Sequence, residues 1–225
     1  MTTESKIYWG VGTLSVLLLL GTLFMPGDPN RKKDLPWHIE HPTAESVRIF
    51  GLTLGEATAN EAEQRFKEEA KLSLFKAPDG KMIVEAFFEQ VNLAGLRSKV
   101  VLIIDAPEDE LKGIYDRGLR MNSTGTGKKI TLSPDDVARL RTFPISSLTY
   151  MPGVRIEDPL FLKRFGKPAQ IIKETRSGAI HWIYPQDGLD ITLGGDEKPL
   201  LQYVLPGEFD KLVKPLLTNG TVVTQ

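Results

Sequence analysis

The stretch RFGKPAQIIKETRSGAIHWIYPQDGLDITL, residues 164–193, decides the fold because its beginning recurs as RFKEEAKLSLFKAPDGKMIVEAFF at residues 65–88. An offset of 99 residues separates Arg65 from Arg164, and the apolar runs that follow keep nearly the same spacing. A fixed offset over a whole segment is typical of a tandem repeat. The sequence therefore predicts one structural unit that occurs twice.

Each copy begins with signals for a short helix. Thr58 and Glu61 form a capping box in the first copy, and Asp158 followed by Pro159 gives an N-cap and a first helical residue in the second. A further helix is predicted after Ser133. Behind the first helix of each copy the apolar period changes from about 3.6 to about 2 residues, which is typical of strands.

One helix on a few short strands buries too little apolar surface to be stable alone, so the two copies should share a core. The predicted fold class is α+β: an N-terminal transmembrane helix followed by two tandem helix-plus-antiparallel-sheet repeats that form one pseudo-symmetric body. The predicted divisions are an anchor at 1–25, a tether at 26–46, a first repeat at 47–118, a linker loop at 119–132, a second repeat at 133–216 and a C-terminal tail at 217–225.

Residues 7–25, IYWGVGTLSVLLLLGTLFM, carry no charge and are long enough to cross a bilayer core at about 1.5 Å per residue. Tyr8 and Trp9 suit a membrane interface. The alternative is a cleaved signal peptide, but Phe24-Met25-Pro26 does not provide the small residues of a cleavage site. The segment predicts an uncleaved membrane anchor.

The orientation of this anchor is open, because Lys6 precedes the span and Arg31, Lys32 and Lys33 follow it. The positive-inside rule alone places the body in the cytoplasm. Bacterial anchors of this kind more often export the body that follows them. The predicted location is the bacterial inner membrane with a periplasmic body, and a cytoplasmic body stays an alternative.

The composition excludes several function classes. The 28 Lys and Arg residues balance 29 Asp and Glu residues, so the chain has no electrostatic footprint for nucleic acid. It has no cysteine, which removes disulfides, thiolate metal sites, cysteine nucleophiles and lipid attachment through cysteine.

His38 and His41 are weak candidates for metal ligands. Pro36 and Pro42 bracket them and argue against the helix that would bring the two side chains to one face. No further ligands lie nearby in the sequence. We therefore expect no metal and no cofactor.

The stretch Gly125-Thr126-Gly127-Lys128 resembles a phosphate-binding loop only superficially. Asn122 stands where that loop needs its first glycine, and Lys129 stands where it needs a hydroxyl residue. Four carboxylates at predicted strand ends and turns likewise lack the spacing of a calcium loop: Asp187, Asp190, Asp196 and Glu197.

His181, Trp182 and Tyr184 are the candidate partner-binding residues. Strand alternation places Trp182 and Tyr184 on one face with Ile180, and His181 on the other. The two aromatic side chains are expected in the core, although their type also suits a binding hot spot. His181 has no nucleophile or second histidine near it in the sequence, so a general-base role is not predicted.

The second copy contains a short set of motifs: Phe165-Gly166-Lys167-Pro168-Ala169, a turn at Gly178, Trp182-Ile183-Tyr184-Pro185 and Gly188-Leu189-Asp190-Ile191. These motifs resemble the repeat of the BamE/SmpA small lipoproteins and of the tandem β-lactamase inhibitory proteins, over 133–205 and more faintly over 56–105. The resemblance implies an exported protein that binds other proteins through its sheet face or loops, without catalytic residues. These lipoproteins attach to the membrane through a lipidated cysteine, which this chain lacks, and the predicted span at 7–25 takes its place. This departure puts an outer-membrane assembly role in doubt.

The predicted function is that of a membrane-anchored binding or scaffold protein, an accessory subunit of an envelope complex and not an enzyme. Its expected partners are the membrane and another membrane or envelope protein. The alternative is a carrier of a small apolar or lipid ligand, which needs a deep apolar cavity between the repeats. An uncommon hydrolase, the third possibility, needs titratable groups that converge in a cleft.

Overall fold

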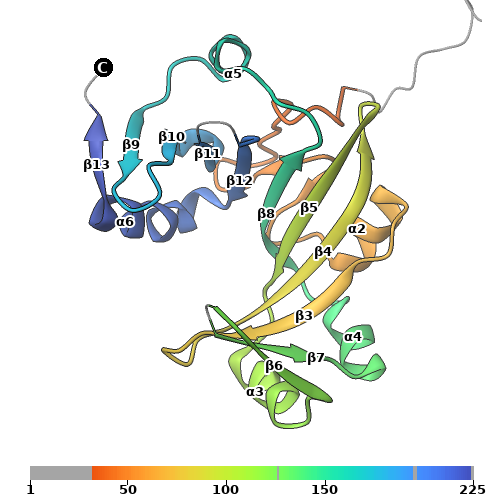
Figure 1. Ribbon diagram of the computed structural model, residues 1–225. Coiled ribbons are helices and arrows are strands. Elements are labelled where there is room, and N and C mark those ends of the chain that lie inside the picture. Colours follow the sequence, from red (N-terminus) through yellow and green to blue (C-terminus); the bar gives the residue numbers. More distant parts are fainter. Residues whose placement is uncertain (1–31, 126, 195–196, 224–225) are drawn as a thin grey trace, which may run out of the picture. The chain divides into compact units, whose positions relative to one another are not determined.

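The computed structural model describes residues 32–125, 127–194 and 197–223 (Figure 1). The largest element of the structure is one antiparallel sheet of eleven strands, in the order β13-β9-β10-β11-β12-β8-β5-β4-β3-β7-β6, and five short α-helices accompany it within the described residues. The strands are β1 Arg48–Ile49, β2 Leu52–Thr53, β3 Lys71–Lys76, β4 Met82–Leu93, β5 Leu96–Ile104, β6 Arg120–Thr124, β7 Gly127–Thr131, β8 Ile145–Pro152, β9 Gln170–Glu174, β10 Ile180–Tyr184, β11 Leu189–Leu193, β12 Leu200–Val204 and β13 Gly220–Val223. The helices are α2 Ala59–Phe66, α3 Glu108–Asp116, α4 Pro134–Leu140, α5 Asp158–Phe165 and α6 Phe209–Asn219, with 3₁₀ turns at Pro185–Asp187 and Pro206–Glu208.

In the first half of the sheet, the meander β3-β4-β5 packs on α2. The predicted capping box is confirmed: the Thr58 hydroxyl accepts from the Glu61 amide at 3.3 Å, and the Thr58 amide donates to the Glu61 carboxylate at 2.7 Å. At the other end of α2, the Phe66 ring meets Phe88 of β4 edge to face, with centroids 5.1 Å apart. The capping box therefore fixes the start of α2, and the last residue of the helix packs its ring into the core.

In the second half, β9-β10-β11-β12 form a four-stranded meander that meets the first half through β8. This strand pairs with β12 on one side and with β5 on the other. Phe161 of α5 is buried, and Phe165 lies 5.6 Å from the ring of Tyr184. The last helix, α6, packs on the opposite side of the sheet, where Phe209 and Val213 contact an apolar cluster on β9, β10 and β12.

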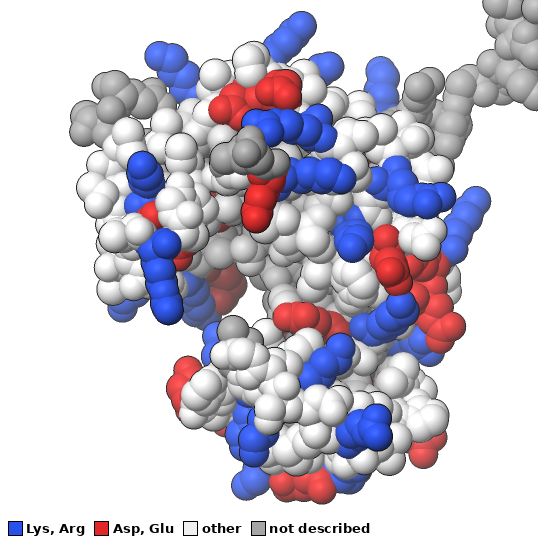
Figure 2. Space-filling view, viewed as in Figure 1, with Lys and Arg blue, Asp and Glu red and all other residues white. Residues whose placement is uncertain are grey.

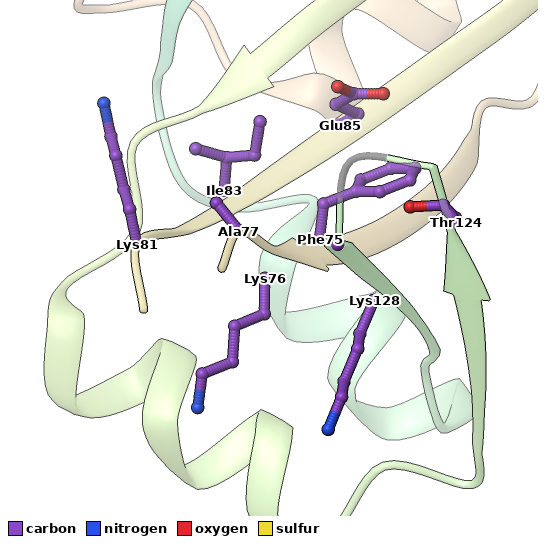
Figure 3. Close-up of a pocket in the computed structure, with 9 residues that line it drawn as sticks. Phe75, Lys76, Ala77, Lys81, Ile83, Glu85, Thr124 and Lys128 are labelled. Carbon is purple, nitrogen blue, oxygen red and sulfur yellow. The ribbon is translucent and has the colours of Figure 1, made fainter. Parts of the chain in front are cut away.

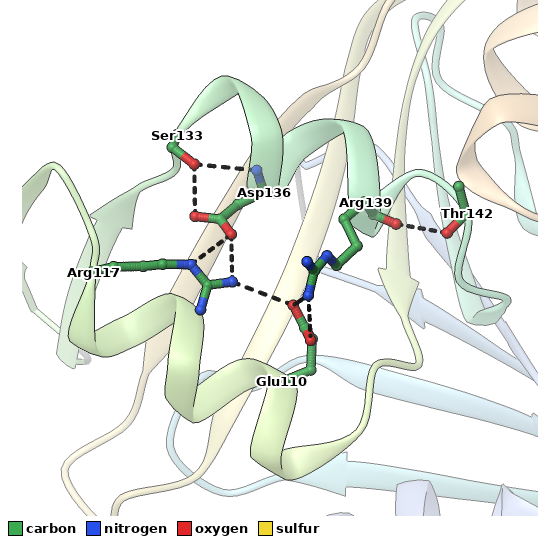
Figure 4. A network of polar contacts seen from close by, with 6 residues as sticks. All are labelled: Glu110, Arg117, Ser133, Asp136, Arg139 and Thr142. Carbon is green, nitrogen blue, oxygen red and sulfur yellow. Dashed lines mark hydrogen bonds and ion pairs between the residues drawn. The ribbon is translucent and has the colours of Figure 1, made fainter.

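A hairpin of β6 and β7 extends the first half beyond β3, and α3 and α4 pack beside it. Figure 4 shows the polar network that joins these two helices. Asp136 accepts hydrogen bonds from Arg117 and Ser133, and Glu110 accepts from Arg117 and Arg139. The 119–132 stretch, which the sequence assigns to a linker loop, thus carries two strands of the sheet.

Residues 33–46, which the sequence assigns to a tether, lie against the sheet. The hydroxyl of Tyr203 in β12 donates to the Pro36 carbonyl at 2.6 Å, and burial raises the pKa of that hydroxyl well above its ordinary value. Arg164 of α5 stacks over the Trp37 ring at 4.8 Å, and Arg65 pairs with Asp34. Contacts to both halves therefore hold this segment in place.

The predicted architecture is wrong, although the described residues do form an α+β structure. The described residues form one large antiparallel sheet with short helices. The two predicted repeats differ, because the second, 133–216, contributes five strands to this sheet, β8 to β12, whereas the first, 47–118, contributes three, β3 to β5. Among residues 32–125, 127–194 and 197–223 no helix is long and apolar enough to cross a membrane, since the longest has 11 residues. The predicted span at 7–25 lies outside the described residues. A single-pass inner-membrane protein with a signal anchor is thus not supported.

Candidate functional site

The register of the strands shows which side chains share a face of the sheet, because directly paired residues point to the same side. One such row runs from Val204 through Ser147 and Ile103 to Glu85. The next row runs from Gln202 through Thr149 and Val101 to Phe87 and Lys71. Both rows lie on the side where α6 packs, since Val204 belongs to its cluster.

The helix α6 covers only the β9 to β12 end of this side. The other helices of the described residues pack on the other side, against a core that includes Val84, Phe88 and Leu102. In Figure 1, α2 lies behind β3, β4 and β5, and none of the helices drawn as ribbons lies in front of these strands. We call the uncovered surface of β3, β4, β5 and β8 the open face; its apolar residues, all half-buried, are Phe75, Ile83, Phe87, Val101, Ile103 and Met151.

The sequence makes β5 apolar on both sides over Val100–Ile104, whereas β4 places both apolar residues, Ile83 and Phe87, and acids, Glu85 and Glu89, on the open face. In β5 the run Val100–Ile104 alternates between core residues and open-face residues without a polar position. An antiparallel strand with one side in water normally alternates apolar and polar residues, whereas a continuous apolar run is typical of a strand covered on both sides. Figure 2 shows uncharged, recessed surface over this central region, with charged side chains around it.

A pocket of about 340 Å³ lies at one end of the open face (Figure 3). Phe75, Ile83 and Glu85 project to the same side there, while Lys76 and Lys128 point away. Burial raises the pKa of the Glu85 carboxyl, and the charge of Lys129 offsets part of that rise. This end of the open face is therefore apolar with one partly desolvated acid.

A second pocket of about 470 Å³ lies where β4, β5 and β8 end, beside the β11–β12 loop. Its lining includes Arg97, Lys99, Lys198 and Met151. Gly153 makes this arrangement possible: a Cβ there would stand 1.9 Å from the Arg97 carbonyl oxygen, so only glycine allows β8 to approach β5 so closely. This end of the open face is basic.

His181 lies on the same side of the sheet, beyond the open face. The row of Thr149 and Gln202 continues to Asp190 and Ile183, and His181 shares the side of Ile183. The Nδ1 atom of His181 lies 2.8 Å from Asp190 Oδ2, and both side chains are buried. Within the described residues the other oxygen, Asp190 Oδ1, has no hydrogen-bond partner.

The electrostatics of this pair favour a protonated histidine. Burial lowers the pKa of His181, but the hydrogen bond and negative charge of Asp190, helped by Glu174, outweigh it and leave the pKa above the ordinary 6.5. Thr192 Oγ1 lies 3.4 Å from the same Nδ1 atom. In a catalytic triad the nucleophile and the orienting acid contact different nitrogens of the histidine ring. Here the Asp190 carboxylate and the Thr192 hydroxyl both lie beside Nδ1 of His181, so these three residues do not form a triad.

Trp182 and Tyr184 lie on the opposite face and are buried, which confirms the prediction that they belong to the core. The Tyr184 hydroxyl donates to the Gly166 carbonyl at 3.0 Å, and burial raises the pKa of that hydroxyl to about 12. A role of His181, Trp182 and Tyr184 in partner binding stays a prediction. Their burial leaves little side-chain surface for it.

His38 and His41 point to different partners. His38 Nε2 contacts Glu40 at 3.2 Å, whereas His41 Nε2 contacts Asp187 at 3.2 Å and its Nδ1 lies 3.1 Å from the Ser46 carbonyl. The part of the chain that the structure describes contains no group of three residues able to hold a metal ion. Two residues of the motifs considered in the sequence, Thr126 and Asp196, lie outside the described residues.

The sequence reasoning missed the open face. The signal was available in β5, where both alternating sets of the run Val100–Ile104 are apolar, but only the strand order shows that no described helix covers one of these sets. Comparison of the chain with models of protein families, with curated proteins and with solved structures finds no match. The resemblance to the BamE/SmpA repeat therefore stays a prediction.

Proposed function

We propose that this chain is a protein-binding subunit and that a partner protein docks on the open face. The observation that carries the proposal is the apolar surface that Phe87 of β4 and Val101 and Ile103 of β5 form on the side that no described helix covers. Contiguous apolar surface of this kind on a folded domain is typical of an interaction site. A sheet face built for water would carry polar side chains at Phe87, Val101 and Ile103.

The distribution of charge around the open face also suits a protein interface. Such interfaces combine a desolvated apolar centre with a polar rim. Here Val101 and Ile103 lie at the centre, and the rim includes Lys71 and Glu89, which pair at 2.6 Å. Lys71 and Glu89 at the rim are exposed, whereas Val101 and Ile103 at the centre are half-buried. A partner that docks here would remove the centre from water and leave the charged rim in contact with solvent.

The alternative role as a lipid carrier finds less support. That role needs a deep apolar cavity between the two halves of the body. Strand β8 lies there instead, paired on both sides, with Leu148 and Tyr150 almost fully buried. The side chains of a central strand thus fill the place where the cavity would be.

Site-specific photo-cross-linking in the source cells tests the proposal. A photoreactive residue at Val101 should give one discrete adduct, and the substitution Ile103→Glu should abolish it because it places a charge in the desolvated centre. The control position is Leu162 of α5, which is 43% exposed and lies on a helix that packs on the other side of the sheet. Equal labelling at Leu162, or no adduct at Val101, would contradict the proposal.

A further inference from the structure

The basic end of the open face has three cationic side chains around one pocket. Arg97 and Lys99 project from β5, and Lys198 comes from the segment before β12. The Lys198 ammonium donates to the Gly153 carbonyl, which holds this side chain against the end of β8. All three cations are exposed to solvent.

The one acid among the described residues that line the pocket is already paired. This acid, Glu89, binds Lys71 at 2.6 Å, and that hydrogen bond and charge lower the pKa of its carboxyl. None of the ion pairs between described residues involves Arg97, Lys99 or Lys198. The pocket therefore carries excess positive charge, although the net charge of the chain is -1.

The floor of the pocket is apolar and continuous with the open face. Met151 is paired directly with Lys99, one row from Val101, and Leu200 in the same lining is 39% exposed. A simple inorganic anion would leave this floor in water. A chain that alternates acidic and apolar side chains would cover the floor and neutralise the cations together.

We infer that the pocket lined by Arg97, Lys99 and Lys198 binds the carboxylates of an acidic, apolar segment of the protein that docks on the open face. This inference rests on the proposed docking. Arginine offers a carboxylate two parallel hydrogen bonds, while the lysines act as point charges beside it. The apolar side chains of the same segment contact Met151 and the residues beyond it.

The test uses the full chain and three fluorescent peptides in which leucine alternates with glutamate, glutamine or lysine. We expect the glutamate peptide to bind most tightly in anisotropy titrations and to weaken as salt is raised. The combined substitutions R97Q, K99Q and K198Q should weaken its binding about tenfold, since each exposed ion pair contributes a few-fold at most. The matched control, K112Q with K163Q and K167Q, removes the same charge from α3 and the α5 region and should change binding less than about twofold.

The outcomes separate the inference from the proposed docking. If the glutamine peptide binds as tightly as the glutamate peptide and Val101→Gln weakens both, the carboxylate inference is overturned while docking on the open face is supported. Tighter binding of the lysine peptide, or equal weakening by the control substitutions, also overturns the inference. If no peptide binds, the inference fails, and the cross-link at Val101 decides on docking separately.

Discussion

His181 Nδ1 and Asp190 Oδ2 lie 2.8 Å apart on neighbouring strands of the sheet, with side chains that are 9% and 3% exposed. A buried ion pair of this kind loses hydration that its mutual attraction only partly restores. It adds little net stability compared with apolar residues, but its members depend on each other. Removing one of them leaves the other as an uncompensated charge or polar group in the protein interior.

Replacement of the histidine alone should therefore be costly. We expect His181→Leu to lower the free energy of unfolding by about 3–5 kcal/mol, because the Asp190 carboxylate is left without its partner. The double variant His181→Leu with Asp190→Leu should recover much of that loss. Urea unfolding of the four proteins of the cycle measures the coupling, and additive effects of the two substitutions would contradict it.

The same pair predicts how stability depends on pH. The pKa of His181 is raised in the folded state, so its contribution is fully present below the unfolded value near 6.5 and is lost as the pH rises through the folded pKa. The wild type should exceed His181→Gln in Tm by more at pH 5.5 than at pH 8.5. A difference in Tm that grows with pH would show that the histidine is neutral in the folded protein.

Two adjacent residues of β5 should respond differently to truncation. Leu102 is fully buried on the helix side, and we expect Leu102→Ala to cost about 2–5 kcal/mol of stability. Ile103 lies half-buried on the open face, so Ile103→Ala should cost clearly less while weakening partner capture. Chemical denaturation and the cross-link at Val101 measure the two effects. An equal loss of stability in both variants would mean that the open face is covered within the folded chain.

The network between α3 and α4 predicts an opposite dependence on pH. Burial alone would raise the pKa of Asp136, but hydrogen bonds from Arg117 and Ser133 outweigh it and leave the pKa lowered. Its contribution to stability is present above the unfolded value and is lost as the pH falls through the folded pKa. Asp136→Asn should thus lower Tm by several degrees at pH 7 and by less at pH 3. The control Asp135→Asn, at an exposed neighbouring position, should leave Tm nearly unchanged.

The close approach of β8 to β5 predicts a position that tolerates only glycine. Gly153→Ala should lower Tm, since the new Cβ would stand 1.9 Å from the Arg97 carbonyl and the strand end must move. Gly207→Ala is the matched control, because nothing lies within 4 Å of the position of its Cβ. Thermal unfolding of both variants is the measurement. Equal Tm values would mean that the end of β8 is free to shift.

Several local elements could be predicted from the sequence, but their assembly could not. The Thr58 cap and the alternation in β10 act over a few residues, so the sequence shows them directly. The pairing of β8 with β5 and β12 joins residues about 50 apart and depends on which strands find each other. The hairpin of β6 and β7 was missed because its strands are polar, and polar strands give no apolar period.

The candidate site was missed for a related reason. In the sequence His181 has no second histidine or nucleophile near it. Its partner Asp190 lies nine residues later, and the pairing of β10 with β11 brings the two side chains together. The open face exists because no described helix covers one side of β4 and β5. The apolar period of a strand shows which residues share a side, but it does not show whether another element covers that side. Residue types therefore predicted core residues such as Trp182 and Tyr184 correctly, whereas the open face could be recognised only from the order of the strands in the sheet.

The position of β8 in the sheet also has a consequence for folding on the ribosome. Strand β5 leaves the ribosome well before β8, its only neighbour on that side, and the apolar run Val100–Ile104 then stands at an unpaired edge. Strand pairings between residues far apart in sequence form slowly. Until such a pairing forms, an uncharged edge strand can pair with strands of other chains and cause aggregation. A nascent chain that stops before Ile145 should thus be a preferred client of chaperones, and the synthesis of β8 is the event that releases it.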